Sequence, residues 1–278
     1  MKIPKVIHYC WFGRGEKPEL AIKCIESWKK VLPEYEIIEW NEDNFDIEQN
    51  LYVKQAYESK KYAFVTDYVR LYVLYNYGGI YMDTDVEVLK PLDPFLEHPA
   101  FSGFENNDSV PTGIMAARKK NKWIKDLLNE YNDLKFIKED GSFDLTTNVV
   151  RITELSMKKY GLEKRSSYQE LKKTVVFYPH DYFCPKDWYT GKINITPNTV
   201  TIHHFSGSWH SAKEKKSHEL RYRLINKYGA VEGNKKYEQY LHRRDLLKWL
   251  GLPFRCILHP IKAIKKIHRI ITKKDRNS

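Results

Sequence analysis

The first half of the chain alternates between short apolar runs and segments whose apolar residues recur at helical spacing. Residues 3–12 (IPKVIHYCWF) are mostly β-branched and aromatic up to Gly13, which predicts a buried strand. Residues 18–32 predict a helix that ends at Pro33, and residues 35–40 predict a second strand. A helix between two strands predicts an α/β fold with a mostly parallel central sheet.

A long helical stretch follows, from about residue 51 to residue 76, with an expected break near Ser59. Gly78 and Gly79 end it, because glycine accepts the left-handed backbone that closes a helix. A short strand then leads directly into Asp83-Thr84-Asp85. Farther along, the same rules predict helices at 123–136, 148–160, 213–228 and 235–250, and strands at 86–89, 174–178 and 199–205.

Charge changes this picture only at the carboxyl terminus. The chain has a formal net charge of +11, yet residues 243–278 alone hold 11 Lys or Arg against 2 Asp or Glu. The body is therefore nearly neutral, and we expect one domain at 1–242 followed by a basic tail at 243–278. Because no basic groove is indicated in the body, nucleic acid is not an expected partner.

The tail itself predicts a basic amphipathic helix. Its isoleucines recur at helical spacing between lysines and arginines, at positions 257, 261, 264, 267 and 271. Such a helix suits an anionic membrane surface, where each cation contributes on the order of 1 kcal/mol. The alternative is a helix that packs on the domain and keeps a solvated basic face.

The cysteines and the amino terminus favour a cytoplasmic protein. The four cysteines are far apart and lack metal-ligand spacing, which is usual in a reducing compartment. The first residues have no signal-peptide pattern, and no run approaches the roughly 18 apolar residues that span a bilayer. Together with the basic tail, this predicts a peripheral protein on the cytoplasmic face of the inner membrane.

Asp83 and Asp85 are the first candidates for chemistry. Residues two apart in an extended segment point to the same side, so both carboxylates emerge together at the end of a strand. Paired carboxylates bind hard divalent cations such as Mn²⁺ or Mg²⁺, and such a cation can neutralise a departing diphosphate. The motif alone is weak evidence, since a solvated turn gives the same pattern.

The surrounding residues are more specific. The run at 62–85 (YAFVTDYVRLYVLYNYGGIYMDTD), the opening at 3–13 (IPKVIHYCWFG) and the pairs Ser27-Trp28 and Trp40-Asn41 resemble the glycosyltransferases that have a sugar-binding region with a DXD motif. This family, glycosyltransferase family 32, includes yeast mannosyltransferases, bacterial capsule and lipopolysaccharide enzymes and, more distantly, the large glucosylating toxins. The resemblance is close over residues 3–95 and returns at 203–209.

The resemblance implies a GT-A type nucleotide-sugar fold and the transfer of a hexose from a UDP-sugar to a saccharide hydroxyl, with retention of the anomeric configuration. It implies a metal held chiefly by Asp85, with Asp83 contacting the donor and assisting the metal. No side chain is implied as a covalent nucleophile. The acceptor is expected to be a membrane-linked saccharide of bacterial surface polysaccharide synthesis.

Five further residues are expected at the donor site. Asp67 and Arg70 share one helix face, where Arg70 offers a cation for phosphate or sugar and Asp67 accepts hydrogen bonds from sugar hydroxyls. The alternative for this pair is an intrahelical ion pair on a solvated surface. In the family the residue that matches Trp11 stacks on uracil, and a core tryptophan is the alternative. Thr66 and Tyr81 complete the expected set, and core packing would equally explain Tyr81.

The second constellation is the segment 203–210 (HHFSGSWH). Strand alternation places only one of His203 and His204 on the ligand side, and neutral imidazole can bind Mn²⁺. We expect His204 as the third metal ligand, although the pattern hardly separates the two histidines. Ser208 and Trp209 are expected near the diphosphate, because related folds close the metal site with a Ser-Trp element.

Two other classes of function stay open. A metal-dependent phosphodiester or pyrophosphate hydrolase also uses clustered carboxylates, but it usually needs more acidic and histidine ligands than these. A non-catalytic carbohydrate-binding or membrane-binding protein could have kept the fold. The sequence does not separate these classes from a transferase except through the family resemblance.

Overall fold

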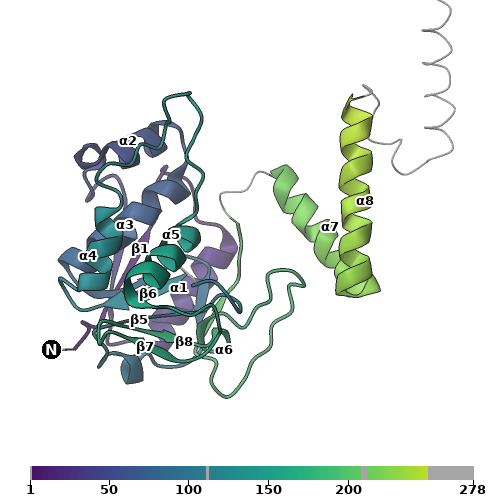
Figure 1. Ribbon diagram of the computed structural model, residues 1–278. Coiled ribbons are helices and arrows are strands. Elements are labelled where there is room, and N and C mark those ends of the chain that lie inside the picture. The colour runs from purple at the N-terminus through teal and green to yellow at the C-terminus, as the bar shows by residue number, and fades with distance from the viewer. Residues whose placement is uncertain (1, 111–112, 208–211, 250–278) are drawn as a thin grey trace, which may run out of the picture. The chain divides into compact units, whose positions relative to one another are not determined.

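Figure 1 shows the computed structural model, which describes residues 2–110, 113–207 and 212–249. The strands are β1 (Val6–Cys10), β2 (Glu36–Trp40), β3 (Gly79–Met82), β4 (Val86–Val88), β5 (Ala100–Gly103), β6 (Ile114–Ala117), β7 (Gln169–Leu171), β8 (Val175–Tyr178) and β9 (Thr201–His203). The helices are α1 (Glu19–Val31), α2 (Leu51–Glu58), α3 (Tyr62–Asn76), α4 (Lys122–Asn129), α5 (Asn148–Leu155), α6 (His180–Phe183), α7 (Ala212–Tyr228) and α8 (Ala230–Trp249). One π-helical turn, Ser156–Tyr160, extends α5.

Seven strands form the central sheet, in the order β2-β1-β3-β6-β5-β8-β7. β1 pairs in parallel with β2 and β3, and β5 pairs in parallel with β8. β6 is antiparallel to both β3 and β5, and β7 is antiparallel to β8. Five strands therefore run one way and two run the other. The predicted α/β fold with a mostly parallel sheet is confirmed.

Each face of the sheet carries an apolar cluster, because alternate residues of a strand point to opposite sides. On β1, Ile7 and Tyr9 belong to one cluster and Cys10 to the other. Helices α2 to α5 pack on the Cys10 face, and α1 packs on the opposite face. In α1, the buried Trp28 donates a hydrogen bond from Nε1 to the Val86 carbonyl at 2.6 Å. This bond fixes α1 to the strand that follows Asp85.

The approach to Asp83 depends on a tight connection between α3 and β3. The expected helix break is confirmed, since Lys60 takes a positive φ of 56° between α2 and α3. Gly78 and Gly79 then join α3 to β3 with φ of +73° and +107°. A Cβ on Gly79 would lie 2.6 Å from the Val6 carbonyl oxygen. Only glycine therefore lets β3 lie directly beside β1.

A separate two-stranded sheet brings two distant segments together. β4 and β9 are antiparallel, with Val86 opposite His203. The pairing continues one step farther, where the His204 N–H donates to the Asp85 carbonyl at 2.9 Å. The residues that follow β3 therefore lie next to the residues that follow β9.

Two compact units divide the chain, one of residues 1–188 and 192–209 and one of residues 189–191 and 210–278. In the second unit α7 and α8 pack against each other (Figure 1), with Gly233 of α8 close to Ile225 of α7. α8 continues without interruption through residue 242, where the basic tail was expected to begin. The amphipathic stretch expected at 257–271 lies outside the described residues. Within the described helices, none combines the length and hydropathy needed to cross a bilayer.

Several elements differ from the local prediction. The helix expected at 123–136 ends at Asn129, and Tyr131 and Phe136 enter the core from irregular backbone, so their apolar spacing only resembled a helix. β5 was missed because its sequence, AFSG, has no β-branched residue. β7 and α6 were missed because they have only three and four residues.

Gly79→Ala is expected to lower the free energy of unfolding by about 3 kcal/mol, through positive-φ strain and a steric clash with the Val6 carbonyl. Gly141→Ala is the matched control, because Gly141 also has a positive φ, while the described residues place no atom within 4 Å of where its Cβ would stand. Strain alone should cost the control about 1 kcal/mol. Urea unfolding followed by circular dichroism measures both, and equal losses would contradict the close approach of β1 and β3.

Candidate active site

Asp83, Asp85 and His203 form a cluster at the carboxyl ends of the parallel strands. Each offers one ligand atom, and these atoms lie within 4.8 Å of one another. Asp83 follows β3, and its N–H donates to the Gly113 carbonyl at 2.8 Å. Asp85 precedes β4, and its Oδ1 lies 3.3 Å from His203 Nε2. The expected pairing of the two aspartates at a strand end is therefore present in the structure.

Asp85 is buried, yet its surroundings keep it ionised. Burial raises the pKa of its carboxyl group, but His203 and the N–H of Ser206, which donates to Oδ2 at 2.7 Å, outweigh that cost and lower the pKa well below its usual range. Burial likewise lowers the pKa of His203, and Asp85 more than reverses the effect. The pair favours a carboxylate beside a protonated imidazole, and a bound cation would replace that proton.

His203, and not His204, lies beside the aspartates. The register of β4 and β9 turns the two side chains to opposite sides, so His204, the expected third ligand, does not face Asp85. His204 Nε2 instead lies 2.8 Å from Glu87 Oε2. The choice between the two histidines thus depends on a strand pairing that the sequence pattern did not contain.

Asp83 also contacts a second set of polar residues, which are Asp67, Arg70 and Tyr81. Arg70 Nη2 is 3.3 Å from Asp67 Oδ1 and 3.1 Å from Asp83 Oδ1, and the Tyr81 hydroxyl donates to the same Asp83 oxygen at 3.0 Å. The Arg70 guanidinium also lies 4.6 Å from the centre of the Tyr81 ring. Asp67 and Arg70 are buried, so the alternative of a solvated surface pair does not apply. Arg70 connects the helix face to the carboxylate cluster.

Unlike Asp85, Asp67 has a raised pKa. Burial raises the pKa of the Asp67 carboxyl group to about 6, although Arg70 lowers it. Asp83 raises this pKa further, and the nearby Asn148 amide lowers it. Among the described residues neither polar atom of Asn148 completes a hydrogen bond by distance and angle. Asp67 therefore gains a proton near pH 6, well above the pH at which an exposed aspartate does so.

The remaining predicted residues fall into two groups. Trp11 follows β1, is half-buried and donates from Nε1 to the Gly15 carbonyl at 2.6 Å, with Lys17 Nζ 5.6 Å from its ring. Its partly buried ring packs against the apolar cluster on the α1 face of the sheet. Thr66 donates to the Ala63 carbonyl inside α3 at 2.7 Å. Ser208 and Trp209 lie outside the described residues.

Two residues near the cluster were missed by the sequence reasoning. Burial raises the pKa of Glu105, which follows β5, while His203 lowers it and Asp83 raises it. Burial lowers the pKa of Lys186, which Asp85 raises, and its Nζ donates to the His204 carbonyl at 2.5 Å. Glu105 follows a strand that had not been predicted. Lys186 forms an isolated β-bridge with Ile193 outside the strands of the sheets, and no local pattern distinguishes it from other lysines.

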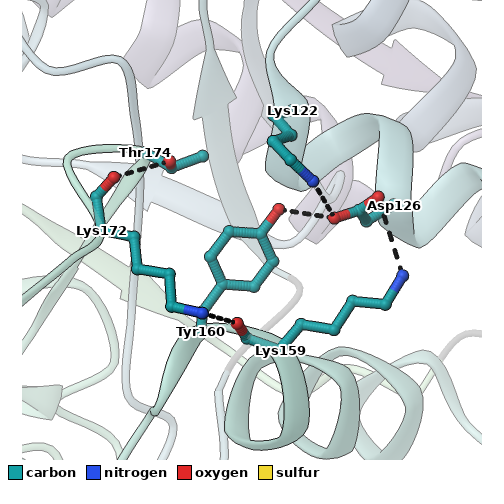
Figure 2. Close-up of a pocket in the computed structure, with 6 residues that line it drawn as sticks. All are labelled: Lys122, Asp126, Lys159, Tyr160, Lys172 and Thr174. Atoms are coloured by element: carbon teal, nitrogen blue, oxygen red, sulfur yellow. Dashed lines mark hydrogen bonds and ion pairs between the residues drawn. The ribbon is translucent and has the colours of Figure 1, made fainter.

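One hollow of the described surface lies away from the aspartates. Figure 2 shows this hollow of about 420 Å³, lined by Lys122, Asp126, Lys159, Tyr160, Lys172 and Thr174. Asp126 accepts hydrogen bonds from Tyr160 at 2.7 Å and from Lys122 at 2.9 Å. Thr174 precedes β8, so the hollow lies at the amino ends of the parallel strands, opposite the aspartates. We assign it no part in the site.

The donor set of the cluster fits a divalent cation. Two carboxylates and one imidazole suit Mn²⁺, which accepts oxygen and nitrogen ligands, whereas Mg²⁺ prefers oxygen alone. Three protein ligands also leave positions for ligands from a substrate. The residues present are therefore compatible with the expected Mn²⁺ or Mg²⁺.

Part of the chain is similar to known proteins. Residues 18–102 match the family described as "Glycosyltransferase sugar-binding region containing DXD motif". Similar curated proteins include Inositol phosphoceramide mannosyltransferase 3 of Schizosaccharomyces pombe, 36% identical over 126 residues, which are 44% of this chain and 35% of that protein. Another is Mannosyl phosphorylinositol ceramide synthase CSH1 of Saccharomyces cerevisiae, 32% identical over 120 residues, which are 40% and 30% of the two chains. The chain thus matches about a third of the length of these relatives.

Two solved structures illustrate the structural likeness. PaToxG Glycosyltransferase is 19% identical with a TM-score of 0.44, covering 57% of this chain and 70% of its own. The galactosyltransferase LgtC, in complex with donor and acceptor sugar analogues, is 14% identical with a TM-score of 0.40, covering 79% and 94%. The segment that matches the family model includes Asp67, Arg70, Asp83 and Asp85. The curated relatives named above are yeast mannosyl-transfer enzymes, not capsule enzymes.

Asp67→Asn is expected to raise the free energy of unfolding at pH 7.5 by on the order of 2 kcal/mol, because it removes a buried carboxylate. In the folded chain the pKa of Asp67 is raised to about 6. The protonated carboxyl group therefore contributes its full stability to the wild-type fold below pH 4, and this contribution is lost as the pH rises through 6. The gain from Asn should therefore vanish in acid.

Asp126→Asn is the control of opposite sign. Although burial raises its pKa, Lys122 and Tyr160 lower the pKa of Asp126 overall, so its ionised form stabilises the fold above pH 4 and that stability is lost in acid. This variant should be less stable at pH 7.5. Thermal unfolding between pH 4 and 8 measures the stability of both variants. If Asp67→Asn is less stable than the parent chain at pH 7.5, the raised pKa of Asp67 is wrong.

Proposed function

We propose that this protein is a metal-dependent glycosyltransferase that moves a hexose from a nucleoside diphosphate sugar to a hydroxyl group of a saccharide. The observation that supports it most is the convergence of Asp83, Asp85 and His203 within 4.8 Å, two of them inside the matched DXD region. A solvated Asp-x-Asp turn without a function would not be expected to lie beside a histidine from another strand. The hypothesis therefore rests on tertiary contact as well as motif.

Asp83, Asp85 and His203 would hold Mn²⁺ or Mg²⁺. When bound, the cation supplies Lewis-acid neutralisation of the diphosphate leaving group. The buried Asp85 stays ionised without it, so the chain itself provides a ready anionic ligand. Lys186, held next to the His204 carbonyl, adds a positive charge on the same side. A departing diphosphate would thus meet cations rather than bare carboxylates.

Arg70, Asp67 and Asp83 would bind the sugar. Arg70 is fixed between two carboxylates, so its donors keep one direction while the hexose binds. Asp67, with a pKa near 6, can accept hydrogen bonds from sugar hydroxyls when ionised. We propose retention of anomeric configuration, with the leaving diphosphate taking the proton of the acceptor hydroxyl.

UDP-hexose is the proposed donor, and a mannosyl donor is the second candidate. The first follows from Trp11, whose half-buried ring at the end of β1 can stack on a nucleobase. The second follows from the yeast relatives, whose names specify mannosyl transfer. Titration with UDP and with GDP in the presence of Mn²⁺ separates the two by their affinities.

The acceptor is proposed to be a saccharide linked to a membrane, as in bacterial surface polysaccharide synthesis. The names of two yeast relatives place their acceptor in inositol phosphoceramide, a membrane lipid, which supports a membrane acceptor without fixing its sugar. The basic tail would hold the protein on the anionic cytoplasmic face of that membrane. The enzyme and its acceptor would then both be bound to the same membrane surface.

Asp85→Asn is expected to reduce Mn²⁺-dependent UDP binding at least tenfold, because it removes the ligand that pairs with His203. His204→Ala is the control and should bind like the parent chain, since His204 faces Glu87. Calorimetry measures binding, and the release of free sugar from UDP-hexoses measures turnover.

Each alternative function has its own result in the same assays. Phosphate release from nucleotides without sugar transfer would indicate a hydrolase. Binding without turnover of UDP-hexoses or of GDP-mannose would indicate a carbohydrate-binding protein. Unchanged nucleotide binding in Asp85→Asn would refute the proposed metal site.

Replacing Lys262, Lys265, Lys266 and Arg269 with serine in the full chain is expected to abolish sedimentation with phosphatidylserine vesicles. Four cations at about 1 kcal/mol each account for roughly a thousandfold loss of affinity. Vesicles of phosphatidylcholine alone are the control surface, and Mn²⁺-dependent UDP binding should be unchanged. If the variant sediments like the parent chain, the tail does not bind the membrane by charge.

A further inference from the structure

The imidazole of His203 has close neighbours at both ring nitrogens and on its ring. Its Nε2 faces Asp85 Oδ1 at 3.3 Å, and its Nδ1 faces the Cys184 Sγ at 3.8 Å. The Phe205 ring centre lies 4.3 Å from the imidazole centre, and a Cβ on Gly113 would lie 2.8 Å from Nδ1. The ring therefore has little freedom to turn, and its two nitrogens have different neighbours.

A histidine that binds a metal through one nitrogen carries its proton on the other. That second nitrogen usually donates to a carboxylate, a backbone carbonyl or water, which fixes both the tautomer and the ring direction. At His203 the described group that faces Nδ1 is a thiol. Sulfur is a weak acceptor, but it satisfies an N–H that would otherwise be buried without a partner.

The position of Cys184 is fixed by the fold rather than by its own side chain. Cys184 is 1% exposed and ends α6, where its N–H donates to the His180 carbonyl at 2.7 Å. The neighbouring Phe183 carbonyl accepts a hydrogen bond from Thr201 Oγ1 at 3.0 Å. Thr201 begins β9, the strand that carries His203. One bond thus ties the cysteine segment to the histidine strand.

We propose that Cys184 is the positioning residue of the metal site. Its sulfur accepts the Nδ1–H of His203 and so directs an unprotonated Nε2 at the cation that Asp83 and Asp85 share. The inference rests on the proposed function, since it concerns the same site. No bond is made or broken in this role, and the thiol does not itself bind the metal.

The choice of sulfur has a consequence for affinity. A carboxylate behind an imidazole raises its basicity and strengthens the metal–nitrogen bond, whereas a neutral thiol does so far less. His203 should then direct the ion without holding it tightly. Such a ligand suits a site in which the nucleotide diphosphate supplies part of the coordination and the product leaves after each turnover.

The test compares Cys184→Ser with Cys184→Val in the full chain. Serine keeps an acceptor in nearly the same place, and valine fills a similar volume without one. We expect Mn²⁺ affinity, measured by the free-ion signal in electron paramagnetic resonance, to stay within about threefold of the parent for serine and to fall about tenfold for valine. Thermal unfolding confirms that both variants fold.

A second readout follows His203 itself. In the parent chain loaded with Zn²⁺, a diamagnetic ion that binds imidazole, long-range ¹H–¹⁵N spectra should show a protonated Nδ1 on His203, assigned by its absence in His203→Asn. Serine should preserve that signal, and valine should shift it or expose it to rapid solvent exchange. A role in packing alone predicts the reverse order, with valine harmless and serine harmful.

The possible failures are distinguishable. Valine binding Mn²⁺ like the parent, or serine and valine losing affinity equally, overturns the positioning role while leaving the metal site intact. A parent chain that binds no Mn²⁺ at all refutes the proposed function instead, and the present inference with it.

Discussion

The structure depends on one buried contact, the pairing of Asp85 with His203 across β4 and β9. An ionised carboxylate at 9% exposure is costly unless cations or hydrogen-bond donors surround it. His203 and the Ser206 N–H provide that compensation from a segment far away in the sequence. The site therefore exists only when the chain has closed this small sheet.

Arg70 plays the corresponding role for the other half of the site. It lies between Asp67 and Asp83 and faces the Tyr81 ring, so one guanidinium balances two carboxylates in a buried space. The balance is uneven, because Asp67 still has a raised pKa while Asp85 has a lowered one. Unequal environments let one carboxylate serve as a permanent anion and another change its protonation near neutral pH. The proposed binding of a cation and of sugar hydroxyls would use both states.

Backbone geometry explains why these groups meet at this edge of the sheet. Gly78 and Gly79 allow α3 to turn directly into β3, so that Arg70 on the helix and Asp83 after the strand end within 3.1 Å. Trp28 ties α1 to Val86 and prevents the turn at Asp83–Asp85 from moving away. The match to the family model covers this part, residues 18–102, and stops before the strand that carries His203. The family match thus describes only half of the assembled site.

What the sequence determined by itself was local. Apolar periodicity and glycine placement predict β1 to β3, the break at Ser59 and the strand end at which Asp83 and Asp85 emerge, because each of these depends on residues a few positions apart. The choice of His203 over His204, and the arrival of Glu105, Lys186 and Cys184 at the cluster, were decided only by tertiary structure. Those outcomes follow from strand register: Val86 lies opposite His203, and a slip of one residue would exchange the two histidines. Register is set by the packing of the whole sheet, and no local pattern contains it.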